Sequence, residues 1–209
     1  HASPADYDDE AVAELDSMVS KRWIKKVSSR SAAKRFVRGR IVVSKLVVIK
    51  KDKLSKNKDG HIIRKTKRRL LLDLKESGIS GASSKHERVI LPRILDVIFD
   101  GLELFRHSRG LRHKLEHLIL DFKNAFFHFP VEPTERRFLV TRVRGYYYIW
   151  LRATQGSRGA PLVCGRALAQ ALRMAASTVP QSSSRSSCYV DDPIMSFVGT
   201  NSTNDRDKA

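Results

Sequence analysis

Apolar residues recur along this chain with two different periods, and each period indicates a different kind of element. A spacing of three or four positions predicts an amphipathic helix over residues 7–27 and a helix within residues 87–105 that begins after Pro92. The apolar, alanine-rich residues 162–176 are also predicted to be helical. Shorter apolar runs, most of them rich in β-branched or aromatic residues, predict strands over residues 41–50, 61–75, 115–122 and 136–151. Because helices and strands do not alternate strictly, the predicted fold class is α+β.

Polar segments separate these elements and predict where the chain turns. The lysine-rich residues 50–60 end in an Asp-Gly pair and predict a β-hairpin with a basic tip. The segment 136–151 is predicted to be a second hairpin that turns near Arg144, and residues 154–161 form a glycine-rich loop. Residues 182–187, SSSRSS, are a low-complexity polar break, and the last ten residues are predicted to fray.

Charge is distributed very unevenly along the sequence. The 209 residues include 40 Lys and Arg against 22 Asp and Glu, a formal net charge of +18. Residues 21–69 hold 20 of the basic residues and only 2 acids, whereas residues 1–20 hold 6 acids and no Lys or Arg. Such a density attracts a polyanion, because each neutralised phosphate releases condensed counterions. A nucleic acid or polyphosphate partner is therefore expected; the alternatives are a solvated, lysine-rich surface and a flexible basic tail.

The composition also disfavours several classes of protein. No run approaches the roughly 18 apolar residues that a membrane-spanning helix needs, so no membrane partner is expected. The acidic first residues are unlike a secretory signal. Cys164 and Cys188 are too few for a disulfide framework or a four-ligand zinc site, and they are expected to be free thiols in a reducing, intracellular compartment.

Two places put acids directly after apolar runs. Asp121 follows residues 118–120, and Asp191 and Asp192 follow Tyr189 and Val190. A carboxylate at a buried strand end is costly unless it is paired or binds a metal, and three carboxylates suffice for two Mg²⁺ ions about 3.5–4 Å apart. Taken alone, an Asp-Asp pair is more often a turn or a helix cap.

The order of several motifs is more specific than any one of them. They are LVVIKKD (46–52), RRLLLDLKESG (68–78), LILDFKNAFFHFPVEP (118–133), ERRFLV (135–140), ATQGSRGAPL (153–162) and YVDD (189–192). Together, over roughly residues 20–199, they resemble the reverse transcriptase domain of retrotransposon and retroviral-type Pol polyproteins. The resemblance implies the fingers and palm of a right-hand polymerase, with the thumb absent and with thumb and RNase H segments expected elsewhere in a longer polyprotein.

The resemblance also implies a division of the chain. It predicts an acidic N-terminal segment, fingers, palm with the first catalytic motif, fingers again, palm with the YVDD turn, and a polar tail, over residues 1–20, 21–82, 83–128, 129–159, 160–199 and 200–209. Two departures weaken the expected YVDD hairpin. The polar residues 182–187 precede it, and Pro193, which lacks a ladder donor, follows the acids directly.

The family pattern assigns roles to individual residues. Two Mg²⁺ ions, or Mn²⁺ in their place, would be bound by Asp121, Asp191 and Asp192 with the backbone carbonyl of Phe122. The incoming nucleotide would be held by Lys50 or Lys51, Arg69, Ala125, Phe126, Gln155 and Gly156. The template would be contacted by Lys65, Lys67, Arg68, Lys75, Arg158 and Pro161. Phe126 would exclude a 2′-hydroxyl; its alternative role is ordinary core packing.

The implied function is RNA-directed DNA polymerisation, a nucleotidyl transfer of dNTPs onto a primer annealed to an RNA or DNA template. The implied location is the nucleus or a cytoplasmic retroelement particle. One alternative is a truncated, inactive remnant that only binds nucleic acid through residues 21–69. Another is an RNA-dependent RNA polymerase, against which Phe126 argues.

Overall fold

The computed structural model describes residues 7, 9–56, 59–84, 87, 90–107, 114–180 and 182–199, without the side chains of Lys53, Lys56, Lys65, Lys67 and His107. The fold is α+β, as the apolar periods predicted. The chain forms two compact units. Unit 1 contains residues 1–84 and 126–160, and unit 2 contains residues 85–125 and 161–209. The predicted tail, residues 200–209, lies outside the described residues.

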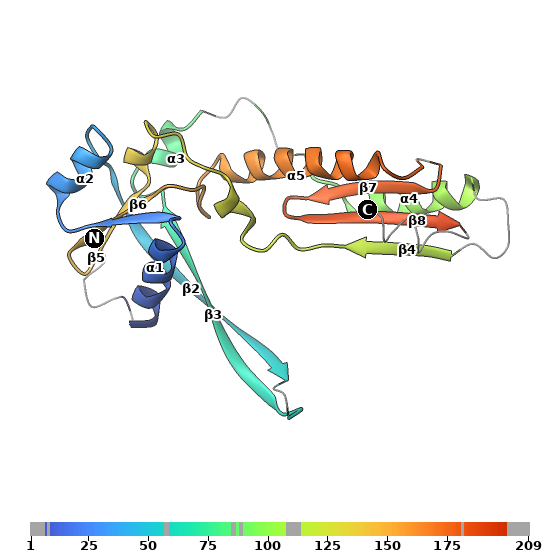
Figure 1. Cartoon of the computed structure of the whole chain (residues 1–209), viewed down its shortest axis with the longest axis horizontal. Coiled ribbons are helices and arrows are strands. Elements are labelled where there is room, and N and C mark those ends of the chain that lie inside the picture. The colour runs from blue at the N-terminus through green and yellow to red at the C-terminus, as the bar shows by residue number, and fades with distance from the viewer. Residues whose placement is uncertain are drawn as a thin grey trace. The chain divides into compact units, whose positions relative to one another are not determined.

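Unit 1 is organised by a five-stranded sheet with the strand order β1-β6-β5-β2-β3. Its strands are β1 (Ile24–Val27), β2 (Val43–Lys56), β3 (Ile62–Asp73), β5 (Val140–Val143) and β6 (Tyr146–Trp150). Strands β2 and β3 form the long antiparallel hairpin that projects from the sheet in Figure 1. The predicted second hairpin is confirmed as β5 and β6. Its turn residues Arg144 and Gly145 have φ of 47° and 86°, as a type I′ turn requires.

Short helices cover this sheet. They are α1 (Asp9–Ser20), α2 (Arg30–Phe36), α3 (Ile79–Ala82) and the 3₁₀ turn η3 (Arg136–Phe138); a further 3₁₀ turn, η2 (Ala125–His128), begins at the boundary between the units. The core of unit 1 is apolar and closed, with Leu15, Leu46, Leu72, Tyr148 and Trp150 almost fully buried. The hydroxyl of Tyr7 donates to the Leu46 carbonyl at 2.8 Å, which ties the start of the chain to β2.

The helix predicted over residues 7–27 is wrong in its second half. The helix α1 ends at Ser20, Arg22 adopts a left-handed φ of 57°, and residues 24–27 form β1. Ile24 pairs with Trp150 of β6, so hydrogen bonds to a distant strand determine this segment. The spacing of Trp23 and Val27 continues the helical pattern by coincidence: the Trp23 ring stacks on Phe127, with centroids 4.3 Å apart.

Unit 2 is organised by a three-stranded antiparallel sheet with the order β4-β8-β7. Two helices accompany it, and α4 packs against β7 and β8 (Figure 1). Its elements are α4 (Ile94–His107), β4 (Lys114–Ile119), α5 (Ala160–Ala176), β7 (Ser184–Tyr189) and β8 (Asp192–Gly199). A small core joins Leu172, Val179, Met195 and Phe197. No helix in the described part of the chain is long and apolar enough to cross a membrane.

The polar break predicted at residues 182–187 is also wrong, because most of it lies in β7. Ser184 to Tyr189 pair with Phe197 to Asp192, so the apolar strand β8 supplies the partner for a polar one. Pro193 is tolerated for a similar reason. The Pro193 carbonyl accepts from the Leu120 N–H at 3.0 Å. The nitrogen of a strand residue faces the same side as its carbonyl, so the missing N–H of Pro193 also faces Leu120, just beyond the end of β4, where the β4–β8 ladder stops.

Candidate functional site

The β7–β8 hairpin carries the YVDD residues at its tip. Tyr189 pairs with Asp192, which leaves Val190 and Asp191 as a two-residue turn. Val190 has a φ of 56°, a conformation that is rare for a β-branched side chain and costs roughly 1–3 kcal/mol. The thiol of Cys188 donates to the Val190 carbonyl at 3.5 Å. The turn that presents the two acids is therefore held in a strained conformation.

Asp121 reaches this turn through backbone pairing that continues beyond β4. Leu120 N–H donates to the Pro193 carbonyl at 3.0 Å, and Phe122 N–H donates to the Asp191 carbonyl at 3.2 Å. Asp121 lies between these two donors, so its backbone is fixed beside the tip of the β7–β8 hairpin. The register of the sheet thus brings acids that are 70 positions apart in the sequence to one end of unit 2.

The electrostatics agree with this placement. Partial burial raises the pKa of Asp192, and the neighbouring carboxylates of Asp191 and Asp121 raise it further. Burial, together with Asp191, raises the pKa of the Cys164 thiol to about 11 and also raises that of Cys188. The carboxylates of Asp121, Asp191 and Asp192 lie close enough to repel one another, and a bound cation relieves such repulsion.

The donor set suits a hard cation, because Mg²⁺ prefers carboxylate and carbonyl oxygens. The Phe122 carbonyl accepts Ala125 N–H at 3.1 Å, which leaves one lone pair for another partner. Among the described residues, however, no group of three or more His, Cys, Asp or Glu side chains is arranged so that it could hold a metal ion. The three acids therefore match the chemistry of a Mg²⁺ site without forming a closed set of ligands.

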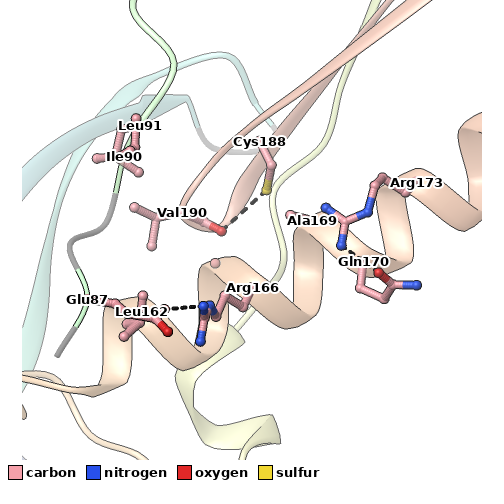
Figure 2. Close-up of a pocket in the computed structure, with 11 residues that line it drawn as sticks. Glu87, Ile90, Leu91, Leu162, Arg166, Ala169, Gln170, Arg173, Cys188 and Val190 are labelled. Carbon is pink, nitrogen blue, oxygen red and sulfur yellow. Dashed lines mark hydrogen bonds and ion pairs between the residues drawn. The ribbon is translucent and has the colours of Figure 1, made fainter. Parts of the chain in front are cut away.

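A cavity of about 470 Å³ adjoins the YVDD turn within unit 2. Figure 2 shows Val190 and Cys188 on one side of it and the side chains of α5 on the other. Arg166 of α5 forms an ion pair with Glu87, and Arg173 donates to the Gln170 side chain. This cavity was not predicted from the sequence. The available signal was a spacing of three or four positions along α5, which places six lining residues on one face of the helix: Leu162, Gly165, Arg166, Ala169, Gln170 and Arg173.

In unit 1, the register of the β2–β3 hairpin separates the two candidate lysines. Directly opposed residues project from the same face of an antiparallel ladder, and successive pairs project from alternate faces. Ile49 opposes Arg69, so Lys51, two positions further on, shares the face of Arg69. Lys50 opposes Arg68 on the other face, where Arg68 forms an ion pair with Glu10 of α1.

The loop before α5 is anchored to the end of β3. Gly156 has a φ of 96°, and a Cβ there would lie 2.4 Å from the Leu72 carbonyl oxygen. Arg158, a predicted template contact, donates to the carbonyls of Ser80 and Ser83 at 3.1 and 3.2 Å. Gln155 is half-buried beside Gly156. Both anchoring contacts are internal to unit 1, so they stabilise the loop that carries Gln155.

The remaining predicted residues are placed as follows. Ala125 is buried and Phe126 half-buried in η2, and Pro161 is the second residue of α5. Lys75 is exposed just after β3, and its backbone N–H donates to the Asp73 carboxylate at 3.0 Å. The side chains of Lys65 and Lys67 lie outside the described part of the chain.

Comparison with known proteins locates the fold. No family model matches the chain, and neither does any curated protein. A foamy viral protease-reverse transcriptase solved in complex with double-stranded DNA matches 96% of this chain with a TM-score of 0.55 and 14% sequence identity. Two structures of prototype foamy virus protease-reverse transcriptase match 86% of the chain, with TM-scores of 0.46 and 0.48 at 16% and 17% identity. The chain spans 27% of the first protein and 18% of the other two. The fold is therefore similar to that of a reverse transcriptase.

Proposed function

We propose that this chain is the fingers and palm part of an RNA-directed DNA polymerase. The observation that carries the proposal is the bond from Phe122 N–H to the Asp191 carbonyl, which joins the first acidic motif to the YVDD turn. A fold similar to that of a reverse transcriptase supports it. In this proposal the fingers are residues 21–82 and 129–159, and the palm is residues 83–128 and 160–199.

Each group has a distinct role in the proposed reaction. Asp121, Asp191 and Asp192, with the Phe122 carbonyl, would hold two Mg²⁺ ions. When bound, these ions supply Lewis-acid stabilisation of the attacking 3′-hydroxyl and of the leaving pyrophosphate.

The nucleotide would be held mainly by unit 1. Arg69 suits a bidentate phosphate grip, and Lys51 on the same face of the hairpin adds a mobile positive charge, so Lys51 is preferred to Lys50. Gln155 and Gly156 would border the base and sugar, and Phe126, next to Ala125, would exclude a 2′-hydroxyl.

The template would lie against the remaining basic residues. Lys75 is exposed and suits a phosphate contact. Arg68 forms an ion pair with Glu10, and Arg158 donates to two backbone carbonyls. These contacts would hold the two guanidinium groups in place while they also contact the template. Lys65, Lys67 and Pro161 complete the proposed set.

Primer extension on poly(rA)/oligo(dT) with dTTP and Mg²⁺ tests the proposal. Asp191→Asn and Asp192→Asn should abolish extension, and Glu116→Gln, which removes an acid from β4 outside the site, should not. Equal extension by wild type and both Asn variants would exclude these acids as the site. Preference for rNTPs over dNTPs would instead favour an RNA polymerase.

A second function is favoured by a specific observation. In the described part of the chain the acids do not form a closed metal-binding set, whereas residues 21–69 are strongly basic. The chain would then bind template and primer without catalysing extension. Salt-sensitive binding of a template–primer, with no incorporation of dNTP at any Mg²⁺ or Mn²⁺ concentration, would establish this alternative.

A further inference from the structure

Unit 1 contains a cavity of about 590 Å³ that is separate from the β2–β3 hairpin. It lies between the C-terminal end of α2 and the turn that leads into η3. Its lining includes three arginines together with a threonine, a proline and a partly exposed aromatic ring: Arg38, Arg136, Arg137, Thr134, Pro133 and Phe36. Close to the cavity, the Val42 N–H donates to the Arg137 carbonyl at 2.9 Å, which joins the segment after α2 to η3.

The arginines of this cavity are held by contacts other than ion pairs with the described carboxylates. The Arg136 Nε donates to the Val131 carbonyl at 3.0 Å, and the Arg137 guanidinium carbon lies 4.6 Å from the centroid of the Phe138 ring. No carboxylate among the described residues forms an ion pair with either of them or with Arg38. The preceding segment, residues 21–40, contains 9 Lys and Arg and no acid. Glu132 and Glu135 lie in the turn before η3 but are not among the lining residues, so the lining itself carries three positive charges and no negative one.

Arg38 occupies a backbone position that favours glycine. It follows the end of α2 with a φ of 53°, and the next N–H, that of Gly39, donates to the Lys34 carbonyl at 3.0 Å. Helices commonly end in this way with Gly, and less often Asn, in the left-handed conformation. An arginine is conformationally unfavourable here, as it is at Arg22, but the Arg38 side chain lines the cavity.

We infer that this cavity binds the sugar–phosphate backbone of single-stranded nucleic acid. Guanidinium groups suit phosphate, and Phe36, with 40% of its surface exposed, can stack on a base. A stacking ring beside several arginines is the combination that single-strand binding uses, whereas a free polyphosphate has no need of the ring. The inference rests on the nucleic-acid binding proposed above and does not require catalysis.

The chain offers a closely matched pair of double variants. Arg38→Gly with Arg137→Gln removes one left-handed arginine and one ring-stacked arginine from the cavity. Arg22→Gly with Arg142→Gln makes the same changes elsewhere in unit 1: Arg22 has a φ of 57°, and Arg142 lies 5.8 Å from the Tyr147 ring. Binding of a fluorescent dT oligonucleotide is measured over a salt series without dNTP or Mg²⁺, and thermal melting verifies folding.

The cavity variant should bind the oligonucleotide about tenfold more weakly, and its slope of log K against log salt should fall by about 1.4, because each single-strand phosphate contact contributes roughly 0.7. The control should change affinity less than about threefold, as expected for general charge. Equal losses in both variants, or no binding by wild type, would overturn the inference. So would inorganic triphosphate that competes at the same concentration as the oligonucleotide. Failure of primer extension alone would refute only the proposed catalysis.

Discussion

Replacing Gly156 by Ala tests whether the loop that carries Gln155 is anchored by contact with β3. The added Cβ would lie 2.4 Å from the Leu72 carbonyl oxygen, far inside van der Waals contact, and at a φ of 96°. That oxygen already accepts the Leu74 N–H at 3.0 Å, and Leu72 is 2% exposed in the core of unit 1. Neither partner can move without disturbing other contacts.

The size of the effect follows from three terms. A positive φ at a residue with a Cβ costs roughly 1–2 kcal/mol. Displacing the Leu72 carbonyl loses a net hydrogen bond of about 1 kcal/mol. Replacing Gly reduces the entropy of the unfolded chain, which offsets about 0.4–1 kcal/mol. The free energy of unfolding of unit 1 should therefore fall by about 2 kcal/mol.

Urea unfolding followed by tryptophan fluorescence measures this change. The chain has 2 tryptophans, Trp23 and Trp150, and both belong to unit 1. With a urea m-value of about 1–3 kcal/mol/M, the midpoint should fall by about 1 M. Gly159→Ala in the same loop is the control, because a Cβ there meets nothing within 4 Å, and it should not destabilise. Midpoints for the two variants within about 0.3 M of each other would refute the reasoning.

Three further outcomes are expected. Asp191→Asn should lower the pKa of Asp192, because the charge of Asp191 helps to raise it and the repulsion between the two carboxylates grows as pH rises. In urea unfolding, the variant should therefore be more stable than wild type at pH 7 and equally stable below about pH 4, where the carboxyls are protonated. A gain in stability that persists at low pH would contradict this. In steady-state primer extension, Lys51→Gln should raise the KM for dTTP about tenfold and Lys50→Gln less than about twofold; the reverse order would refute the assignment from register. Cys164, whose pKa burial raises to about 11, should react with iodoacetamide at pH 8 only after unfolding, as followed by mass spectrometry, and rapid labelling of the native protein would show that it is accessible.

The elements whose pattern is local were predictable. The helix predicted over 162–176 is α5, and the hairpin predicted over 136–151 forms with its turn at Arg144. Both depend on residues that are near one another in the sequence: an apolar, alanine-rich run for the helix, and a two-residue turn that ends in glycine for the hairpin. The strands 24–27 and 184–189 were not predictable in this way, because their hydrogen-bond partners are far away in the sequence.

The site shows the same division. The sequence indicated that Asp121, Asp191 and Asp192 belong together, through their apolar context and through the resemblance. It left open whether Lys50 or Lys51 accompanies Arg69, and it contained no sign of the arginine cavity beside α2. These depend on strand register and on contacts between α2 and the turn before η3, which no short-range pattern encodes.

By itself, the sequence determined the net charge of +18, its concentration in residues 21–69, the positions of the acids after apolar runs, and the helices and hairpins with local patterns. Only the tertiary structure decided that a serine-rich segment is the strand β7, that Phe122 N–H meets the Asp191 carbonyl, and that Lys51 shares a face with Arg69. The physical reason is that backbone hydrogen bonds between strands can be satisfied by any extended segment that the fold brings alongside, so pairing and register depend on the whole unit.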